Sequence, residues 1–179
     1  MTRINLLRAA LAVAVAATLL PQGALAQLGR IPGDEVPAGW PPIEIGARIG
    51  YDNSQRNEVA GAMLRIPVHP SAHVEVLPSL DVTFLRGLRE YQYNFEAAYL
   101  TAGRSGGLYG GGGIGFRNTI VPSDPDAGRR MLTTYSIVVG AKFGGDGRVN
   151  PVLEFRRVFS SDLAVDPQQV TLGATVELW

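Results

Sequence analysis

The stretch 108–116, LYGGGGIGF, carries the pattern in this chain that is most suggestive of ligand chemistry. Gly110, Gly112 and Gly115 have the G-x-G-x-x-G spacing of loops that hold a dinucleotide phosphate. Such a loop needs a helix directly after the glycines, because the phosphate sits at the helix N-terminus. Here the chain continues as FRNTIV (116–121), which is typical of more strand. We therefore predict that the glycines lie inside a β-strand and bind no nucleotide.

Metal chemistry is the next possibility that the residue types raise. The two histidines, His69 and His73, flank Pro70 and Ser71, and no third ligand is evident beside them. Asp124 and Asp126 surround a proline in a pattern that lacks the regular oxygen spacing of a calcium loop and fits a turn. The chain has no cysteine. We expect no metal and no cofactor.

The N-terminus predicts export. Arg3 and Arg8 precede an uninterrupted apolar run over 9–20, and Ala24 and Ala26 form a small-x-small cleavage site. We predict a cleaved signal peptide over 1–26, the alternative being an uncleaved anchor. Cleavage leaves 14 basic residues against 16 acidic ones, because the signal segment holds two of the 16 basic residues and no acid. The chain after cleavage therefore has no net positive charge, and we expect no binding of nucleic acid.

Segment 27–42 is rich in proline and glycine, and we interpret it as an irregular periplasmic leader. After it, apolar and polar residues alternate with period two, and no helical period intervenes. The predicted strands cover 43–51, 59–66, 74–84, 91–99, 108–117, 134–143, 153–156 and 170–178.

Eight strands of this kind predict an all-β fold over 43–179, an eight-stranded antiparallel up-and-down transmembrane β-barrel. The short connections 68–73, 102–107 and 143–148 fall on one side, which we assign to the periplasm with the N-terminus. The connections 52–57, 118–130 and 159–169 fall on the outer side. Segment 85–90 is short although it lies on the outer side.

Alternation alone fits both a membrane barrel and a soluble, lipocalin-like barrel. The charge composition of the polar face distinguishes the two. This face is ionised with both signs and contains a single lysine, whereas a solvated outer face would favour lysine over arginine. We predict that these charges pair inside a narrow lumen. The predicted lumen charge network is Glu44, Arg48, Arg65, Glu75, Asp81, Glu96, Arg117, Lys142, Glu154, Arg156 and Glu177.

Aromatic residues on the apolar face are expected to form two girdles at the membrane interfaces, with Phe95, Tyr135 and Phe155 nearer mid-depth. The predicted outer girdle is Tyr51, Phe84, Tyr91, Tyr93, Phe116 and Phe159, and the predicted inner girdle is Trp40, Tyr99, Phe143 and Trp179.

The glycine run and Pro78 are expected to have local effects on the strands that contain them. Gly111, Gly113 and Gly115 would face the lumen and leave room for Glu96 and Lys142. Gly110 and Gly112 would face lipid under neighbouring aromatic rings. Pro78 lies inside the predicted strand 74–84, where we expect a bulge or a lost ladder bond and a local kink.

The signal peptide, the strand count, PVLEFRR (151–157) and VTLGATVELW (170–179) resemble the small outer-membrane β-barrels of Gram-negative bacteria, a group that includes the OmpA transmembrane domain, OmpX and OmpW-like proteins. Trp179 departs from the group's pattern, because it is out of phase with the outward residues of the last strand. The resemblance implies an outer-membrane location, with outer-membrane lipids and lipopolysaccharide as partners and a further extracellular partner contacting the loops.

The resemblance implies a non-enzymatic role in envelope structure or surface interaction. One alternative is a narrow channel for small solutes, and another is a soluble periplasmic barrel. A third is a lipid A-modifying enzyme, because outer-membrane lipid A deacylases use a His-x-Ser pair with a glutamate and His69 and Ser71 match that spacing. We expect the two residues to lie in a solvated turn without a catalytic role.

Overall fold

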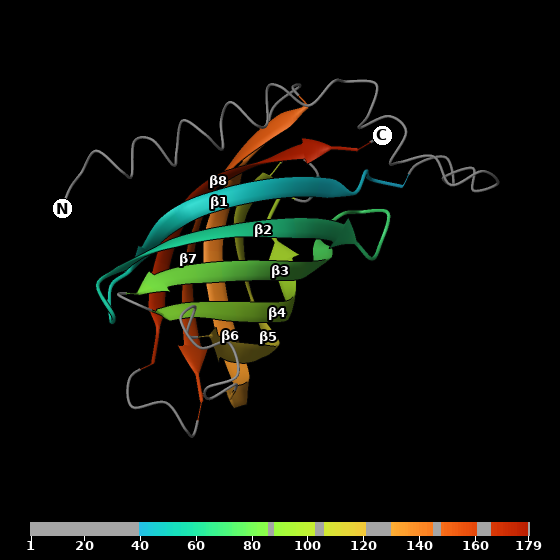
Figure 1. The fold of residues 1–179 in the computed structure, drawn as a ribbon. Coiled ribbons are helices and arrows are strands. Elements are labelled where there is room, and N and C mark those ends of the chain that lie inside the picture. The colour runs from blue at the N-terminus through green and yellow to red at the C-terminus, as the bar shows by residue number, and fades with distance from the viewer. Residues whose placement is uncertain are drawn as a thin grey trace, which may run out of the picture.

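The computed structural model describes residues 40–85, 88–102, 106–120, 130–144, 148–160 and 166–178. The predicted signal peptide, most of the leader and Trp179 lie outside these residues. The eight predicted strands are confirmed (Figure 1). They are β1 (Glu44–Asp52), β2 (Asn57–Pro67), β3 (Val74–Leu85), β4 (Leu88–Leu100), β5 (Gly106–Ile120), β6 (Arg130–Phe143), β7 (Val149–Phe159) and β8 (Gln168–Glu177).

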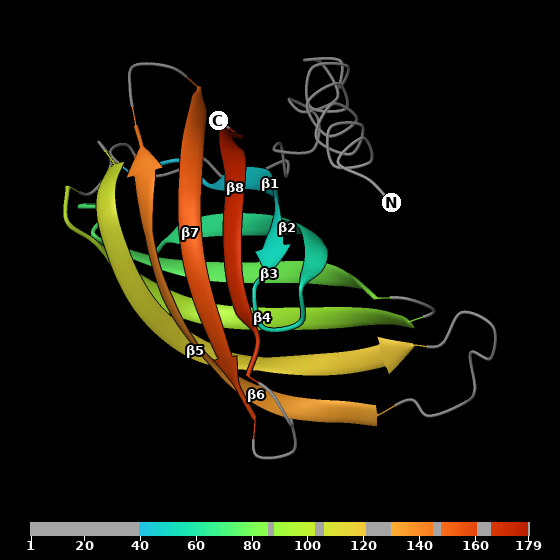
Figure 2. The same cartoon turned by 90° about the vertical axis from the view of Figure 1, so that its left-hand side faces the viewer.

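Each strand pairs antiparallel with its neighbours in sequence, and β8 pairs with β1, so the sheet closes into a barrel. The pairing is staggered. A path of Cα partners from Ile66 in β2 runs round the barrel to Gln168 in β8, whose carbonyl accepts from Asn53 N at 2.8 Å. The β1–β2 register begins with Glu44 opposite Arg65, and one residue further it brings Ile66 opposite Ile43. The circuit from Ile66 therefore reaches Asn53, ten residues after Ile43. Such a stagger tilts the strands, and the two walls cross steeply (Figure 2).

Pro78 interrupts one ladder without a bulge. The β2–β3 register is the same on both sides of it, from Met63 opposite Ser79 to Ile66 opposite Val76, but the pairs between them are missing. On its other side Pro78 remains paired with Phe95 of β4. The predicted loss of ladder bonding is confirmed and the alternative of a bulge is wrong, because a missing amide hydrogen removes bonds without adding a residue.

The glycine run lies inside β5, as predicted, but the reason for the inward glycines differs from the expected one. A Cβ at Gly113 would lie 2.0 Å from the backbone oxygen of Phe95, and one at Gly111 would lie 2.0 Å from that of Ala97. Glycine is therefore required by the close approach of the β4 backbone, and not by the side chains of Glu96 and Lys142. On the outer face, the nearest atom to a Cβ at Gly110 belongs to Val139, 3.8 Å away, and not to an aromatic ring.

The barrel is apolar outside and charged inside. Exposure alternates strictly along β7, where Asn150, Glu154 and Arg156 are buried while Leu153 and Phe155 are exposed. A soluble barrel has the opposite distribution. A protein in water does not leave so much contiguous apolar surface uncovered, which argues against the soluble alternative.

Candidate functional site: the barrel lumen

The two openings of the barrel differ in what surrounds them. The terminal end is where β1 starts and β8 stops, together with the connections after β2, β4 and β6. The loop end carries the connections after β1, β3, β5 and β7. Both names are used in this sense below.

Five charged side chains fill the middle of the lumen, and we call them the central network. Arg48 Nε and Nη2 donate to Asp81 at 2.9 and 2.7 Å, and Arg48 Nη1 donates to Glu154 at 2.7 Å. Arg156 Nε and Nη2 donate to Glu96 at 2.8 and 2.6 Å, and Arg156 Nη1 donates to Asp81 at 2.8 Å. Each arginine thus makes one bidentate pair and one further hydrogen bond to a second carboxylate, the geometry in which buried ion pairs offset their desolvation.

Neutral side chains complete this network. The Tyr109 hydroxyl donates to Glu154 Oε2 at 2.8 Å, the Ser136 hydroxyl donates to Glu96 Oε1 at 2.6 Å, and Arg48 Nη2 also donates to Ser79 Oγ at 2.9 Å. Every side-chain nitrogen and oxygen of the five charged residues has a partner. The middle of the lumen is therefore closed by a fully bonded set of groups.

Two further ion pairs lie nearer the terminal end. Arg65 Nε donates to Glu75 Oε2 at 2.8 Å, and the Arg65 guanidinium lies 4.5 Å from the centre of the Tyr109 ring. Lys142 Nζ pairs with Glu44, which also accepts from Thr175. Tyr109 contacts both the Arg65 pair and the central network, so it joins the two levels.

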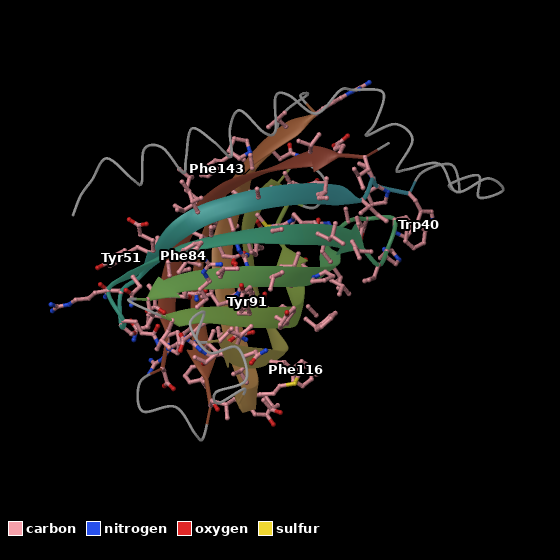
Figure 3. The ribbon with its side chains drawn as sticks, in the orientation of Figure 1. Trp40, Tyr51, Phe84, Tyr91, Phe116 and Phe143 are labelled. Carbon is pink, nitrogen blue, oxygen red and sulfur yellow. The ribbon has the colours of Figure 1, made fainter. Side chains whose placement is uncertain are left out.

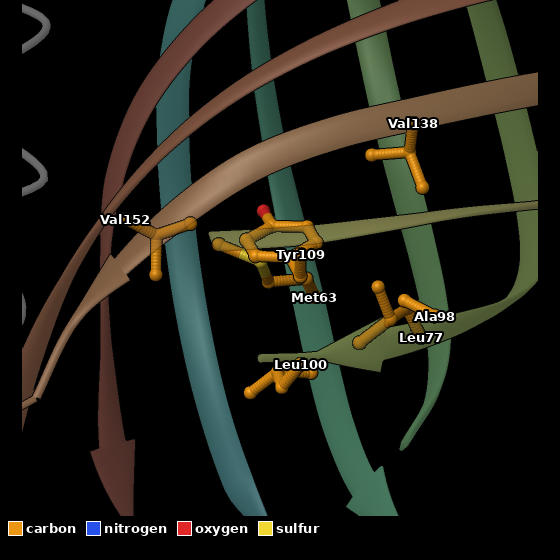
Figure 4. Packing of buried hydrophobic residues seen from close by; sticks show 7 residues of the cluster. All are labelled: Met63, Leu77, Ala98, Leu100, Tyr109, Val138 and Val152. Atoms are coloured by element: carbon orange, nitrogen blue, oxygen red, sulfur yellow. The ribbon is translucent and has the colours of Figure 1, made fainter. Parts of the chain in front are cut away.

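Apolar side chains also occupy the lumen, which we did not predict from its polar face. Tyr109 packs among them, close to Met63 and Leu100 (Figure 4). This part of the lumen is a small apolar core, which is called the dry core below. The buried cluster is Met63, Leu77, Ala98, Leu100, Tyr109, Val138 and Val152.

At the loop end the lumen is polar but less well bonded. Arg117 Nη2 donates to Glu90, and Asp52 Oδ1 accepts from the backbone amides of Ser54 and Gln55 at 2.9 and 3.1 Å. Arg117 Nε and Nη1 and Asp52 Oδ2 are buried without a hydrogen-bond partner. The loop end thus differs from the central network in how completely its buried groups are satisfied.

Ten of the eleven predicted lumen residues are buried, and each of the ten makes an ion pair. Glu177 is the exception. It lies half-buried at the terminal end, opposite Glu44, and pairs with no charge among the described residues. Glu90 was missed, because segment 85–90 was interpreted as a connection, although Glu90 is in phase with Gln92. Asp52 and Gln169 were also missed, and the same alternation would have identified them.

Nine of the ten predicted girdle residues lie on described strands or beside them, with Phe143 and Tyr99 among the most exposed. In Figure 3 Trp40 is labelled at the right and Tyr51 at the left, with Phe143 above the strands and Phe116 below them. Tyr93 lies further from its strand end than the rest. Phe95, Tyr135 and Phe155 are exposed on the same outward face nearer mid-strand.

His69 and Ser71 lie in the exposed turn after β2 at the terminal end, with His69 Nδ1 and Ser71 Oγ 3.0 Å apart. The Ser71 backbone amide also donates to Nδ1, at 3.2 Å. This nitrogen therefore acts as an acceptor that organises the turn. No carboxylate bonds to His69 among the described residues.

No group of three metal-ligating side chains occurs within the described ranges. The part of the chain that the structure describes also contains no helix long and apolar enough to cross a membrane.

Solved structures give a fold-level comparison. The N-terminal β-barrel domain of OprF from Pseudomonas aeruginosa superposes with a TM-score of 0.61 at 17% identity, covering 77% of this chain and 98% of that one. The chain has the fold of the small outer-membrane β-barrels of Gram-negative bacteria. Neisserial surface protein A matches this outer-membrane barrel fold with a TM-score of 0.59 at 9% identity, covering 75% and 95% of the two chains.

The outer-membrane enzyme PagL shares the outer-membrane barrel fold too, with a TM-score of 0.50 at 14% identity over 74% of this chain and 98% of that one. This architecture therefore carries both enzymatic and non-enzymatic proteins. No protein-family description matches the sequence. No curated protein sequence matches it either.

Proposed function

We propose that the protein resides in the outer membrane as a non-enzymatic β-barrel that contributes to envelope structure and surface interaction through its loop end. The single observation that carries the proposal is the inverted distribution of side chains, with large apolar residues outside and the central network inside. An apolar exterior of this kind suits contact with the lipid chains of a bilayer. A lumen filled by hydrogen-bonded, ion-paired side chains resists the passage of solutes.

A basic side chain on the outer face of the barrel supports contact with lipid headgroups. Arg157 lies near the loop end of β7, with its guanidinium 4.9 Å from the Phe159 ring centre and 3.4 Å from Asp166. A long basic side chain over an aromatic ring suits the membrane interface, where it reaches phosphate groups. Lipopolysaccharide and outer-membrane lipids are the partners that we propose for this surface.

The membrane location is tested by cell fractionation and by gel mobility. A folded barrel runs faster unboiled than boiled, and we expect the protein in the outer-membrane fraction with that behaviour. Recovery in the soluble periplasmic fraction with comigrating boiled and unboiled samples would show that the location is wrong. A deletion strain then tests the role, through its lipid A composition and its sensitivity to detergents and small antibiotics.

The hydrogen bond between His69 and Ser71 favours one second candidate, a lipid-modifying enzyme. If the deletion strain has altered lipid A, His69→Ala and Ser71→Ala are each expected to restore the parental lipid A as well as the parent gene does. Failure of both variants to restore it would instead establish the catalytic pair.

A further inference from the structure

Unsatisfied polar atoms gather in one layer of the lumen, at the loop end, which we call the loop-end layer. Its members are Asp52, Gln92, Arg117 and Gln169, each at most 1% exposed. Asp52 lies opposite Gln169 on adjacent strands β1 and β8, and Gln92 lies opposite Arg117 on β4 and β5. The layer is thus built from two walls that face each other across an eight-stranded barrel.

Six side-chain atoms of this layer have no hydrogen-bond partner: Asp52 Oδ2, Gln92 Oε1, Arg117 Nε, Arg117 Nη1, Gln169 Nε2 and Gln169 Oε1. Three are donors and three are acceptors. Each buried unsatisfied group is unfavourable, and a mixture of donors and acceptors is what water satisfies best. The central network directly beneath has no such atom among its five residues.

The terminal-end Arg65 does not form a second layer of this kind. Its two atoms without a hydrogen-bond partner, Nη1 and Nη2, belong to a guanidinium that lies over the Tyr109 ring and forms an ion pair with Glu75. A cation over an aromatic face is stabilised without a hydrogen bond at every nitrogen.

The turn between β1 and β2 reaches across the loop-end layer. With its amide nitrogen facing Glu90, Gln55 donates to Glu90 Oε2 at 3.2 Å and accepts from Arg117 Nη2 at 3.1 Å, so a β1–β2 residue bonds to β4 and β5. The turn itself is under strain, because Arg56 has a φ of 56°, a left-handed conformation that is unfavourable for a non-glycine residue.

We propose that the turn 53–56 is a lid that opens at the loop end, so that water enters and satisfies the loop-end layer down to the central network. Opening relieves a strained backbone and hydrates six polar atoms, and it exchanges the two side-chain bonds of Gln55 and the bonds from the Ser54 and Gln55 amides to Asp52 Oδ1 for bonds to water. The result is a lumen with an outward vestibule and a closed middle. This inference does not depend on the membrane in which the barrel resides.

Single-cysteine labelling tests the lid, since the chain has no cysteine of its own. Gln169→Cys places a thiol in the loop-end layer and sacrifices no side-chain hydrogen bond, whereas Val138→Cys places one in the dry core. The probe is a small, negatively charged methanethiosulfonate, applied to barrels whose folding is verified by gel mobility. We expect Gln169→Cys to react about tenfold faster than Val138→Cys or more, because labelling of a buried thiol follows local opening.

The lid itself is tested by adding Gln55→Ala, with Asn53→Ala as the matched control in the same turn. Gln55→Ala should accelerate labelling of Gln169→Cys several-fold, and Asn53→Ala, whose side chain is exposed, should leave the rate unchanged. Equal rates for Gln169→Cys and Val138→Cys would overturn the vestibule. Equal rates with Gln55→Ala and Asn53→Ala would overturn the lid.

Discussion

Arg156→Met is the substitution that tests most directly what the central network does for stability. Arg156 is 2% exposed and holds Glu96 and Asp81 through three hydrogen bonds of 2.6 to 2.8 Å. The network has two arginines against three carboxylates, and the substitution leaves one arginine against three. Removing one partner of a buried ion pair costs about 3–5 kcal/mol, because the remaining charges stay buried without compensation.

A loss of that size lowers the folded-to-unfolded ratio by a factor on the order of 10² to 10⁴. The assay is a urea titration of the barrel in detergent micelles, with the folded fraction measured from unboiled gel mobility. The matched control is Arg157→Met, one residue along and on the outer face. Its pair with Asp166 is 3.4 Å long and partly exposed, and such surface pairs contribute about 0–1 kcal/mol.

A second variant separates charge imbalance from lost packing. Adding Glu96→Gln to Arg156→Met removes one of the uncompensated carboxylates, so the double variant should be more stable than Arg156→Met alone. If Arg156→Met unfolds at the same urea concentration as Arg157→Met, the central network contributes no net stability and the reasoning fails.

Three further substitutions have expected outcomes. Gly113→Leu should prevent barrel assembly, whereas Gly110→Ala should be tolerated, because a Cβ meets the β4 backbone at 2.0 Å in the first case and Val139 at 3.8 Å in the second; equal yields of heat-modifiable barrel for both would contradict this. Leu100→Ala should destabilise the barrel by about 2–5 kcal/mol in the same urea titration, since Leu100 is fully buried in the dry core. A change near zero would mean that this part of the lumen is hydrated. Tyr109→Phe should cost about 1–2 kcal/mol, because Glu154 Oε2 loses its hydroxyl donor; unchanged stability would show that water replaces the hydroxyl.

Alternation in the sequence was sufficient to predict the eight strands and the facing of their side chains. It works because the side-chain period of a strand is two, so that a residue such as Arg48 can face the lumen only if Ile49 faces outward. The same rule also places Glu90 and Gln169 in the lumen. They were missed only because their strands, β4 and β8, were predicted too short at the loop end.

Contacts across the lumen were not predictable in the same way. Whether Arg48 meets Asp81, Glu154 or another acid depends on the stagger of the strands, which sums eight separate registers. Alternation fixes none of them. The close approach of the β4 backbone to Gly113 was not predictable either, because alternation gives the facing of a side chain and not its distance from a neighbouring backbone. The dry core was missed because a few apolar residues, such as Met63 and Leu77, lie in phase with many charges.

The central network also has a consequence for the order of assembly. Arg48 in β1 bonds to Glu154 in β7, 106 residues away, and Arg156 bonds to Asp81 in β3, 75 residues away. These partners meet only when β8 reaches β1, so an open sheet carries unpaired arginines and carboxylates that require water. Closure of the backbone ladder and neutralisation of the interior are then a single late event. Until that event the charges keep the unfinished barrel hydrated along the face that later becomes its lumen.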